Sequence, residues 1–259
     1  MTKLSICIIC KNEESKIATC LQSVSWADEI IIVDSGSTDR TLEIAKEYTD
    51  NIYIESDWQG FGIQRRRAED YATNDWVFAI DCDEIVSETL KLEILDKLSK
   101  AKNTDVLCVN RLTNFCGEFI YHSGWYPDKI ARIYNKNNIR YNSVLVHEAL
   151  DFNKASTVKK IHLKGDLLHY QYDDLYQYIN KRNRYASLSA DDKYKKGKQG
   201  GLTKATFSAI FAFIRHYFLR LGFLDGKLGF VIAVIQMQYT FNKYMFAYFL
   251  YKSNQGNKE

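Results

Sequence analysis

The chain has 259 residues, of which 46% are hydrophobic and 26% are charged, and its formal net charge is +3. This composition excludes a largely disordered chain and fits one globular domain, alone or with an appendage. Residues 1–150 hold 17 Lys and Arg against 24 Asp and Glu, whereas residues 151–259 hold 18 against 8. An acidic front half and a basic back half indicate two different tasks.

The first hundred residues alternate apolar runs typical of buried strands with segments of helical periodicity. The predicted strands are residues 4–10, 29–33, 51–55 and 76–80. The predicted helices are residues 13–24, a segment after residue 39, residues 61–71 and residues 87–100. Near-continuous apolar strands between amphipathic helices indicate a mostly parallel sheet with helices on both faces. We therefore predict an α/β, Rossmann-like fold.

The pattern changes after Asp105. Short strand-like pieces follow at residues 106–111, 130–134, 144–150, 157–163 and 167–170. They predict a mixed sheet region added to the parallel core. From Asp173 the pattern is helical, first rich in Tyr and Lys and then apolar. We expect a sheet domain at residues 1–172 and a C-terminal appendage of basic amphipathic helices at residues 173–259.

Polar residues directly follow three of the predicted strands. They are Lys11-Asn12-Glu13-Glu14, Asp34-Ser35-Gly36-Ser37-Thr38-Asp39 and Asp81-Cys82-Asp83-Glu84. Ligands of an open parallel sheet bind outside the carboxyl ends of its strands, so three polar clusters at one edge indicate a binding site. Each cluster alone also fits a helix cap or a solvated turn.

Asp81 and Asp83 are the most informative of these residues. Because they follow a buried strand, their carboxylates lie close together at the sheet edge, and each raises the pKa of the other unless a cation joins them. Carboxylate oxygens suit Mg²⁺ or Mn²⁺, which often take further ligands from water and substrate phosphates. An Asp-x-Asp triplet arises often by chance, and the buried strand before it strengthens the signal.

In their order and spacing these motifs resemble the family-two inverting glycosyltransferases with the GT-A fold. The motifs are residues 5–14, 31–41 and 81–84. More narrowly, residues 60–65, 146–148, 168–170 and 223–226 resemble the bacterial lipopolysaccharide-core glucosyltransferases, which add glucose to inner-core heptose. The broad resemblance covers about residues 1–110, and the narrow one covers nearly the whole chain with softer motifs. Cys82 departs from the family, in which a small residue such as Ala is usual at this position.

The resemblance implies a role for each matching residue of the nucleotide site. Asn12 and Glu13 would line the uridine pocket of a UDP-sugar donor. Asp34 would accept a hydrogen bond from the base. Asp81 would hold the ribose or a metal-bound water.

The resemblance also implies a metal site. Asp83 would bind the Mg²⁺ or Mn²⁺ ion directly. His169 would be a further ligand, because the GT-A resemblance places a metal-binding His late in the fold. The alternative for His169 is a satisfied core residue, which is the usual state of a lone His on an apolar strand.

An inverting transfer needs a base for the acceptor hydroxyl and positive charge for the departing diphosphate. Glu148 is our candidate base, because it is a charged residue in the apolar run 145–150. The alternatives are that Glu148 points to solvent and that Glu84 is the base. For the diphosphate we select Arg65 from the run 65–67 and Lys181 from the run 181–184. Most of each run is solvated, because a helix turns consecutive residues to different faces.

The back half predicts the acceptor and the location. Residues 181–227 hold 11 Lys and Arg against three Asp, and an apolar helix surface spans 207–218. Basic and apolar residues together favour an anionic membrane surface carrying a lipid-anchored oligosaccharide acceptor, rather than nucleic acid. The alternative is that these helices bury their apolar faces on each other. The run 228–235 is too short to span a bilayer, which needs roughly 20 apolar residues.

Cysteine usage bears on the compartment. The six Cys lie mostly in apolar runs, and a strand pattern starts at once after Met1. Free thiols without a signal peptide indicate a cytoplasmic protein, which we expect to be peripheral on the inner face of the cytoplasmic membrane.

The sequence thus predicts transfer of a sugar, glucose by resemblance, from a UDP-sugar to a lipopolysaccharide or lipooligosaccharide inner-core heptose. Three alternatives stay open. They are a different glycosyltransferase of cell-surface polysaccharide synthesis, a metal-dependent nucleotidyltransferase and a non-catalytic membrane scaffold. A nucleotidyltransferase usually has a Gly-rich phosphate loop after the first strand, and residues 10–14 contain no Gly.

Overall fold

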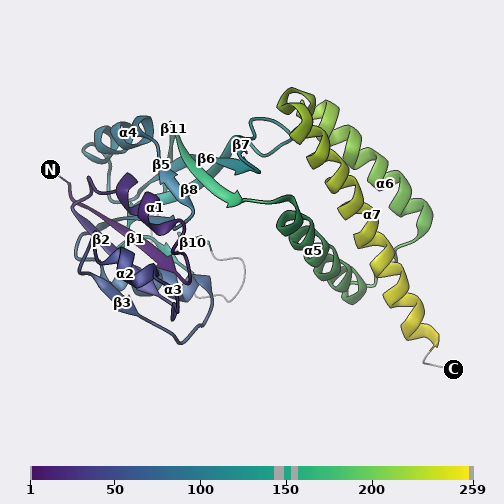
Figure 1. Ribbon diagram of the computed structural model, residues 1–259, viewed down its shortest axis with the longest axis horizontal. Helices are drawn as coiled ribbons and strands as arrows, with labels where there is room; N and C mark the ends of the chain where they lie inside the picture. Colours follow the sequence, from purple (N-terminus) through teal and green to yellow (C-terminus); the bar gives the residue numbers. More distant parts are fainter. Residues whose placement is uncertain (1, 143–148, 153–156, 257–259) are drawn as a thin grey trace. The chain divides into compact units, whose positions relative to one another are not determined.

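The computed structural model describes residues 2–142, 149–152 and 157–256 (Figure 1). The chain forms two compact units. The first comprises Met1–Arg111 and Asp128–His169, and the second comprises Leu112–Pro127 and Tyr170–Glu259. The expected boundary at residue 172 lies close to the transition after His169, whereas the inclusion of Leu112–Pro127 in the second unit was not predicted from the sequence.

The first unit is built on a mixed β-sheet. Its strands are β1 (Leu4–Cys10), β2 (Glu29–Asp34), β3 (Ile52–Ile54), β4 (Trp76–Asp81), β5 (Glu84–Val86), β8 (Asp128–Asn135), and the larger parts of β6 (Asp105–Phe115) and β11 (Lys159–Tyr172). The order is β3-β2-β1-β4-β8-β6-β11-β5. The first four strands are parallel, and β8 pairs antiparallel with both β4 and β6. The predicted α/β fold, with a mixed region added to a parallel core, is confirmed.

One predicted break in the sheet is absent. Residues 157–163 and 167–170 were expected as separate pieces, but both belong largely to the single strand β11. The strand continues through Gly165, where a Cβ atom would lie 2.4 Å from the Cα of Leu90. Gly165 therefore permits the close approach of a helix instead of ending the strand.

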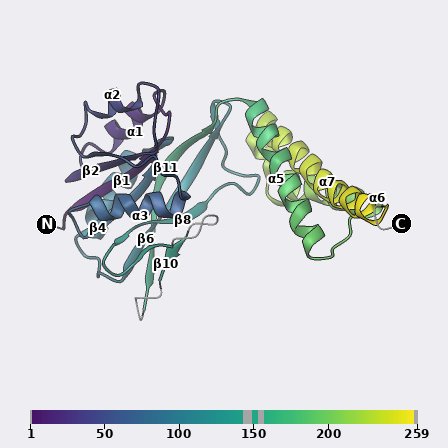
Figure 2. The ribbon, with the colours of Figure 1, turned by 90° about the horizontal axis from the view of Figure 1, so that it is seen from below.

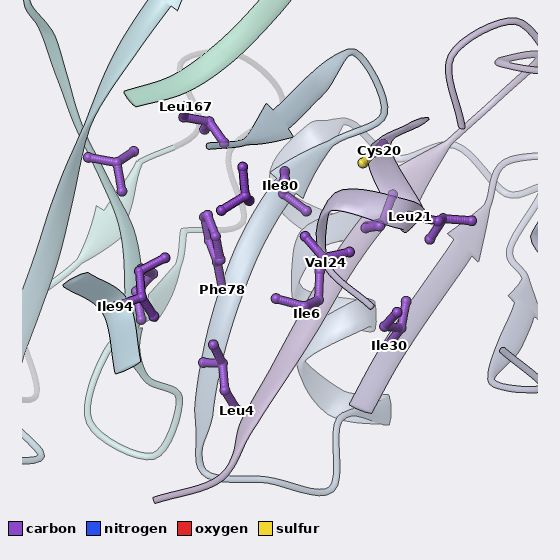
Figure 3. Packing of buried hydrophobic residues seen from close by; sticks show 14 of the residues in the cluster. Leu4, Ile6, Cys20, Leu21, Val24, Ile30, Phe78, Ile80, Ile94 and Leu167 are labelled. Atoms are coloured by element: carbon purple, nitrogen blue, oxygen red, sulfur yellow. The ribbon is translucent and has the colours of Figure 1, made fainter. Parts of the chain in front are cut away.

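Helices cover both faces of this sheet (Figure 2). One buried cluster joins β1 and β4 to α1 (Ile17–Ser23), α2 (Thr41–Ala45) and α4 (Glu88–Leu98). A second cluster joins the same strands to α3 (Phe61–Tyr71). Successive residues of a strand point to opposite faces, so Ile6 and Ile8 pack in the first cluster and Cys7 and Ile9 in the second. Figure 3 shows side chains from α1, β1 and β4 in the first cluster.

The structure also contains a small two-stranded sheet that is separate from the main sheet. It consists of β9 (Arg140–Tyr141) and β10 (Leu150–Asp151), which pair antiparallel. Tyr141 and Leu150 belong to the same buried cluster as α3. This small sheet therefore packs on the α3 side of the main sheet.

The second unit is mainly helical. It contains α5 (Leu175–Lys195), α6 (Leu202–Ile214), a π-helical segment (Arg215–Leu219), a 3-10 segment (Gly222–Asp225) and α7 (Gly226–Gly256). Its short strand β7 (Glu118–Phe119) pairs with the end of β6. Both α5 and α6 pack against α7. Among the residues that the structure describes, no helix is long and apolar enough to cross a membrane.

The core of the first unit gives a matched test of packing on α4. Leu90 is fully buried, whereas 59% of Leu92 on the same helix is exposed. Leu90→Ala should lower the free energy of unfolding by about 2–5 kcal/mol, because it removes buried methyl groups and leaves a cavity. Leu92→Ala should cost under about 1 kcal/mol. Urea unfolding measures both, and equal losses would contradict the packing of α4 described above.

Candidate functional site

The loops after β1, β2 and β4 lie at one edge of the sheet. In the parallel register, Cys10 of β1 lies opposite Asp34 of β2, and Ile9 lies opposite Asp81 of β4. The three strands therefore end at nearly the same level. The expectation that the three polar clusters share one edge is confirmed.

Two of these loops are tied to each other by hydrogen bonds. The backbone N–H of Asn12 donates to the Ser37 hydroxyl at 2.8 Å, and the Thr38 N–H donates to the Asn12 side-chain oxygen at 2.8 Å. The Glu13 N–H donates to the Thr41 hydroxyl at 2.8 Å. Asn12 has a φ of 55°, a left-handed conformation that Asn tolerates better than most residues. The periodicity predicted a helix that begins at Glu13, but α1 begins only at Ile17. These contacts of the loop explain the difference.

Asp34 shapes the loop after β2. Its side chain is fully buried, and its carboxylate accepts hydrogen bonds from the N–H groups of Gly36 and Ser37, each at 2.8 Å. The Ser37 hydroxyl also donates to it. The predicted hydrogen bond from a nucleotide base to Asp34 stays a prediction, and the contacts in the protein give this carboxylate a structural role in the turn.

Asp81 lies in a buried network of ion pairs. Arg65 donates to one carboxylate oxygen at 2.6 Å, and Arg132 donates to the other at 2.9 Å. Arg132 also donates to Glu84 at 2.8 Å, and the second Glu84 oxygen accepts the Asp81 N–H at 2.9 Å. Arg132 thus bridges the two ends of the turn Asp81–Glu84, and Arg65 holds its first residue.

The network shifts the pKa values of its carboxylates in opposite directions. Burial raises the pKa of Asp81, but the charges of Arg65 and Arg132 outweigh it and hold that pKa well below its usual range. Burial raises the pKa of Glu84 above its usual value, although Arg132 opposes the shift. Repulsion was expected between Asp81 and its neighbouring carboxylate unless a cation joined them. For Asp81, the cations are Arg65 and Arg132 of the protein itself.

Glu84 does not suit the role of a base. Its side chain is fully buried, and both oxygens accept hydrogen bonds within the network. A base must reach the proton that it removes. The burial therefore disfavours the alternative that Glu84 is the base, which stays a prediction.

Asp83 faces His169 across the turn. The His169 Nε2 atom lies 3.4 Å from an Asp83 oxygen, and β5 and β11 pair so that His169 lies opposite Glu84. Burial and the charge of Asp83 raise the pKa of Glu13, so this carboxyl lies within the field of Asp83. The structure thus brings Asp83 together with His169, which come from two separate segments.

The chemistry of these residues fits a divalent metal ion. In the described part of the chain, no group of three or more His, Cys, Asp or Glu is arranged to hold a metal. Asp83 and His169 offer one carboxylate and one imidazole. Mg²⁺ commonly uses one or two protein carboxylates and takes its other ligands from water and substrate phosphates, so this small set suits a metal bound together with a nucleotide.

Two of the predicted site residues lie elsewhere. Glu148 lies outside the described residues. Lys181 is on α5 in the second unit, where its Nζ atom lies 5.1 Å from the ring centroid of Tyr172. The roles of both residues stay predictions.

The contributions of Arg132 and Asp225 were not predicted from the sequence. Arg132 was visible as a lone cation in the apolar run 130–134, but its partner was not. In the second unit, the 3%-exposed carboxylate of Asp225 accepts hydrogen bonds from the backbone N–H groups of Tyr121 and His122 and from the Ser123 hydroxyl. Asp225 thus fixes the loop at residues 121–126. Trp125 of this loop is partly buried and packs against the core cluster of the unit.

Known proteins share extensive sequence with this chain. Residues 5–160 match the family model described as glycosyl transferase family 2. An uncharacterized glycosyltransferase of Rickettsia typhi is 34% identical over 244 residues, which are 91% of this chain and 83% of that protein. A lipopolysaccharide core biosynthesis glycosyltransferase of Rhizobium meliloti is 30% identical over 252 residues, which are 92% of this chain and 89% of that protein.

Solved structures show weaker likeness. TarS of S. aureus in complex with UDP-GlcNAc is 16% identical with a TM-score of 0.47, covering 97% of this chain and 92% of that chain. Glucosyl-3-phosphoglycerate synthase from Mycobacterium tuberculosis, in complex with Mg²⁺ and UDP, is 24% identical with a TM-score of 0.35, covering 44% of each chain.

The ion-pair network predicts a large effect of removing Arg132. Arg132→Met leaves Asp81 with Arg65, and it leaves the buried Glu84 with Arg111, whose Nη1 atom lies 4.0 Å away, so the free energy of unfolding should fall by about 3–5 kcal/mol. Arg40→Met removes an ion pair with Glu43 at the surface and should leave stability unchanged within error. Chemical denaturation measures both variants. An Arg132→Met protein as stable as the native one would refute the network.

Proposed function

The chain belongs to glycosyl transferase family 2, and on this premise we propose that it is an inverting enzyme acting on a UDP-sugar. The proposed reaction moves glucose from UDP-glucose to a heptose of a lipopolysaccharide or lipooligosaccharide inner core. The observation that carries this proposal is the approach of Asp83 and His169 to 3.4 Å at the carboxyl edge of the sheet. The 30% identity to a lipopolysaccharide core biosynthesis enzyme supports the acceptor class.

The loops after β1 and β2, which are joined by hydrogen bonds, form the proposed uridine site. Asn12 and Glu13 line it, and Asp34 keeps the second loop in place from beneath. Asp81 is proposed to contact the ribose or a water, and Arg65 to supply positive charge near the diphosphate. The Asp81 carboxylate suits this role, because the two arginines keep it ionised and fixed in orientation.

Asp83 and His169 are the proposed holders of Mg²⁺ or Mn²⁺. When bound, such an ion supplies positive charge against the departing diphosphate, so no general acid is needed. The protein's own residues do the remaining work. The Asp83 side chain is 25% exposed and His169 is buried, so part of the carboxylate is accessible while the imidazole lies on its strand.

Glu148 is the proposed base. It would accept the proton of the acceptor hydroxyl as that oxygen attacks the anomeric carbon from the side opposite the diphosphate. The carbon–oxygen bond to UDP then breaks, and the configuration at the anomeric carbon inverts. The burial of both Glu84 oxygens in the ion-pair network favours Glu148 over the other candidate named from the sequence.

The alternatives now differ in support. Family membership argues against a nucleotidyltransferase, and the persistence of Asp34, Asp81 and Asp83 in an ordered site argues against a non-catalytic scaffold. A different glycosyltransferase of cell-surface polysaccharide synthesis fits the same family. Only the acceptor distinguishes it from the proposed enzyme.

A surface of the second unit supports membrane association. Helix α6 exposes Phe207, Ile210, Phe211 and Ile214, at helical spacing, while its buried residues are Ala205 and Ala209. This helix therefore packs through small side chains and presents its large apolar ones to solvent. Exposed Phe218, Leu219, Phe223 and Leu224 continue the apolar surface through the next two short helical segments. Exposed apolar surface of this kind marks an interaction site.

The proposed occupant of this surface is an anionic lipid bilayer. Lys204 of α6 and Arg215 of the π-helical segment are exposed, as is Lys227 at the start of α7, and the back half of the chain is strongly basic. Cations around an apolar helix face suit the interface of a membrane that carries negative lipids. The proposed location is accordingly the inner face of the cytoplasmic membrane, where a lipid-anchored acceptor lies.

The proposed reaction predicts separate effects on binding and transfer. Glu148→Gln should bind UDP-glucose with affinity close to native but transfer glucose at least about 100-fold more slowly, because it lacks the base. The assay follows radiolabelled glucose from UDP-glucose to a heptose-bearing lipid acceptor, with and without EDTA. Glu88→Gln, an exposed change on α4, serves as the control and should transfer normally.

Two outcomes would refute parts of this proposal. Native turnover by Glu148→Gln would exclude Glu148 as the base. Absence of both UDP release and transfer by the native protein, under every metal condition, would exclude the enzyme itself. A panel of UDP-sugars in the same assay identifies the donor.

The proposed membrane surface predicts that acidic substitutions on it weaken binding of the protein to anionic vesicles. The double variant Phe207→Glu/Phe211→Glu should bind vesicles containing phosphatidylglycerol at least about tenfold more weakly than the native protein, because it loses apolar burial and gains repulsion. Leu92→Glu makes the same type of change on α4 and should bind normally. Vesicle co-sedimentation at low salt measures the partition. Native-like binding by the double variant would contradict the assignment of this surface.

A further inference from the structure

A cationic cavity lies beside Asp81 in the first unit. Its volume is about 430 Å³, and Arg65, Arg111, Arg132 and Lys160 line it. Asp81 is the carboxylate of the wall, and Glu84 and Asp128 pair with Arg132 and Arg111. Among the residues that the structure describes, four cations thus face three carboxylates, so one positive charge is in excess. A substrate with negative charge would restore the balance.

Arg65 has donors that its neighbours leave unused. Its side chain is 7% exposed, and one terminal nitrogen donates to Asp81. The Nε and Nη1 atoms are buried and have no hydrogen-bond partner among the described residues. An unmet buried donor costs about 1–3 kcal/mol, so such groups normally have a partner. An oxyanion in the cavity would provide acceptors for them.

Apolar and aromatic groups complete the wall. Arg65 lies over the Tyr141 ring at 5.2 Å, and Lys160 lies over the Phe152 ring at 5.3 Å. Ile130 and Leu150 also line the cavity. A sugar ring offers apolar C–H faces to such a surface, while a charged substituent meets the arginines. The combination suits an anionic sugar better than a bare ion.

The position of the cavity indicates which substrate carries this charge. Its lining comes from α3, β4, β6, β8, β9, β10, β11 and adjoining residues. None of it comes from the loops after β1 and β2, which form the proposed uridine site. Asp81 and Arg65 line the cavity and also belong to the proposed donor site, so the cavity borders that site, whereas Arg111 and Lys160 come from β6 and β11.

We propose that this cavity binds a phosphate or carboxylate group on the acceptor sugar. The assignment to an acceptor rests on the proposed glycosyltransferase function, whereas the binding of an anionic sugar does not. Arg65 and Arg111 donate to the oxyanion, Lys160 adds charge at the mouth, and Tyr141 supports the guanidinium of Arg65. The acceptor would thus be selected for a charged group as well as for its hydroxyl.

The test measures binding to the full-length protein by calorimetry with three probes. They are glucose 6-phosphate, glucuronate and glucose. At least one charged sugar should bind about tenfold more tightly than glucose, since hydrogen bonds to charged groups are the stronger ones. Arg111→Met and Lys160→Met should each weaken that binding about fivefold or more. Lys164→Met removes an exposed lysine of β11 outside the cavity and should bind as the native protein does.

A parallel titration with UDP separates the two sources of negative charge. UDP affinity should be unchanged in Arg111→Met and Lys160→Met. Equal losses of UDP and sugar-anion affinity would assign the cavity to the donor diphosphate and overturn the proposal. Equal binding of all three sugars, or no binding of either anion, would also overturn it. A protein that binds sugar anions but neither binds nor turns over UDP-glucose would refute the proposed function and leave the anion site intact.

Discussion

The site depends on the pairing of Asp81 and Glu84 with Arg65 and Arg132 at the end of β4. Burying a carboxylate is costly unless a cation and hydrogen bonds accompany it, and this network supplies both. It holds the turn after β4, because Arg132 bridges Asp81 and Glu84 while Glu84 accepts the Asp81 N–H. A fixed turn directs Asp83 toward His169. The orientation of the proposed metal ligands is therefore a consequence of this ion-pair network.

The same network lies between the parallel and the antiparallel parts of the sheet in the first unit. On the parallel side, loops joined by hydrogen bonds of Asn12 and Thr41 form the proposed nucleotide surface. On the antiparallel side, β6, β8 and β11 carry Arg111, Arg132 and Lys160 into one cavity. Asp81 lies on the border of the two. An acceptor anchored on one side and a donor anchored on the other would meet at Asp81, which is where an inverting transfer needs its reactants.

Local patterns predicted much of this architecture, and contacts between distant segments account for what they missed. The buried strand before Asp81 and the polar ends of β1 and β2 were sufficient to predict the sheet edge and its polar clusters. Arg132 became part of the site only because β8 pairs with β4, placing Ile133 opposite Phe78. The inclusion of Leu112–Pro127 in the second unit depends on Asp225, about a hundred residues away, which no periodicity reveals. The residues on either side of Gly165 were predicted as separate strand pieces, because the sequence does not reveal that Leu90 approaches Gly165.

The central claim is that Asp83 and His169 hold a divalent ion together with a nucleotide. Electron paramagnetic resonance of Mn²⁺, titrated with the protein in the presence of UDP, tests it without relying on turnover. The native protein should remove free Mn²⁺ from the spectrum, Asp83→Asn should leave most of it free, and the surface variant Asp96→Asn should match the native protein. Native-like Mn²⁺ binding by Asp83→Asn, or no binding by the native protein with UDP present, would contradict the account.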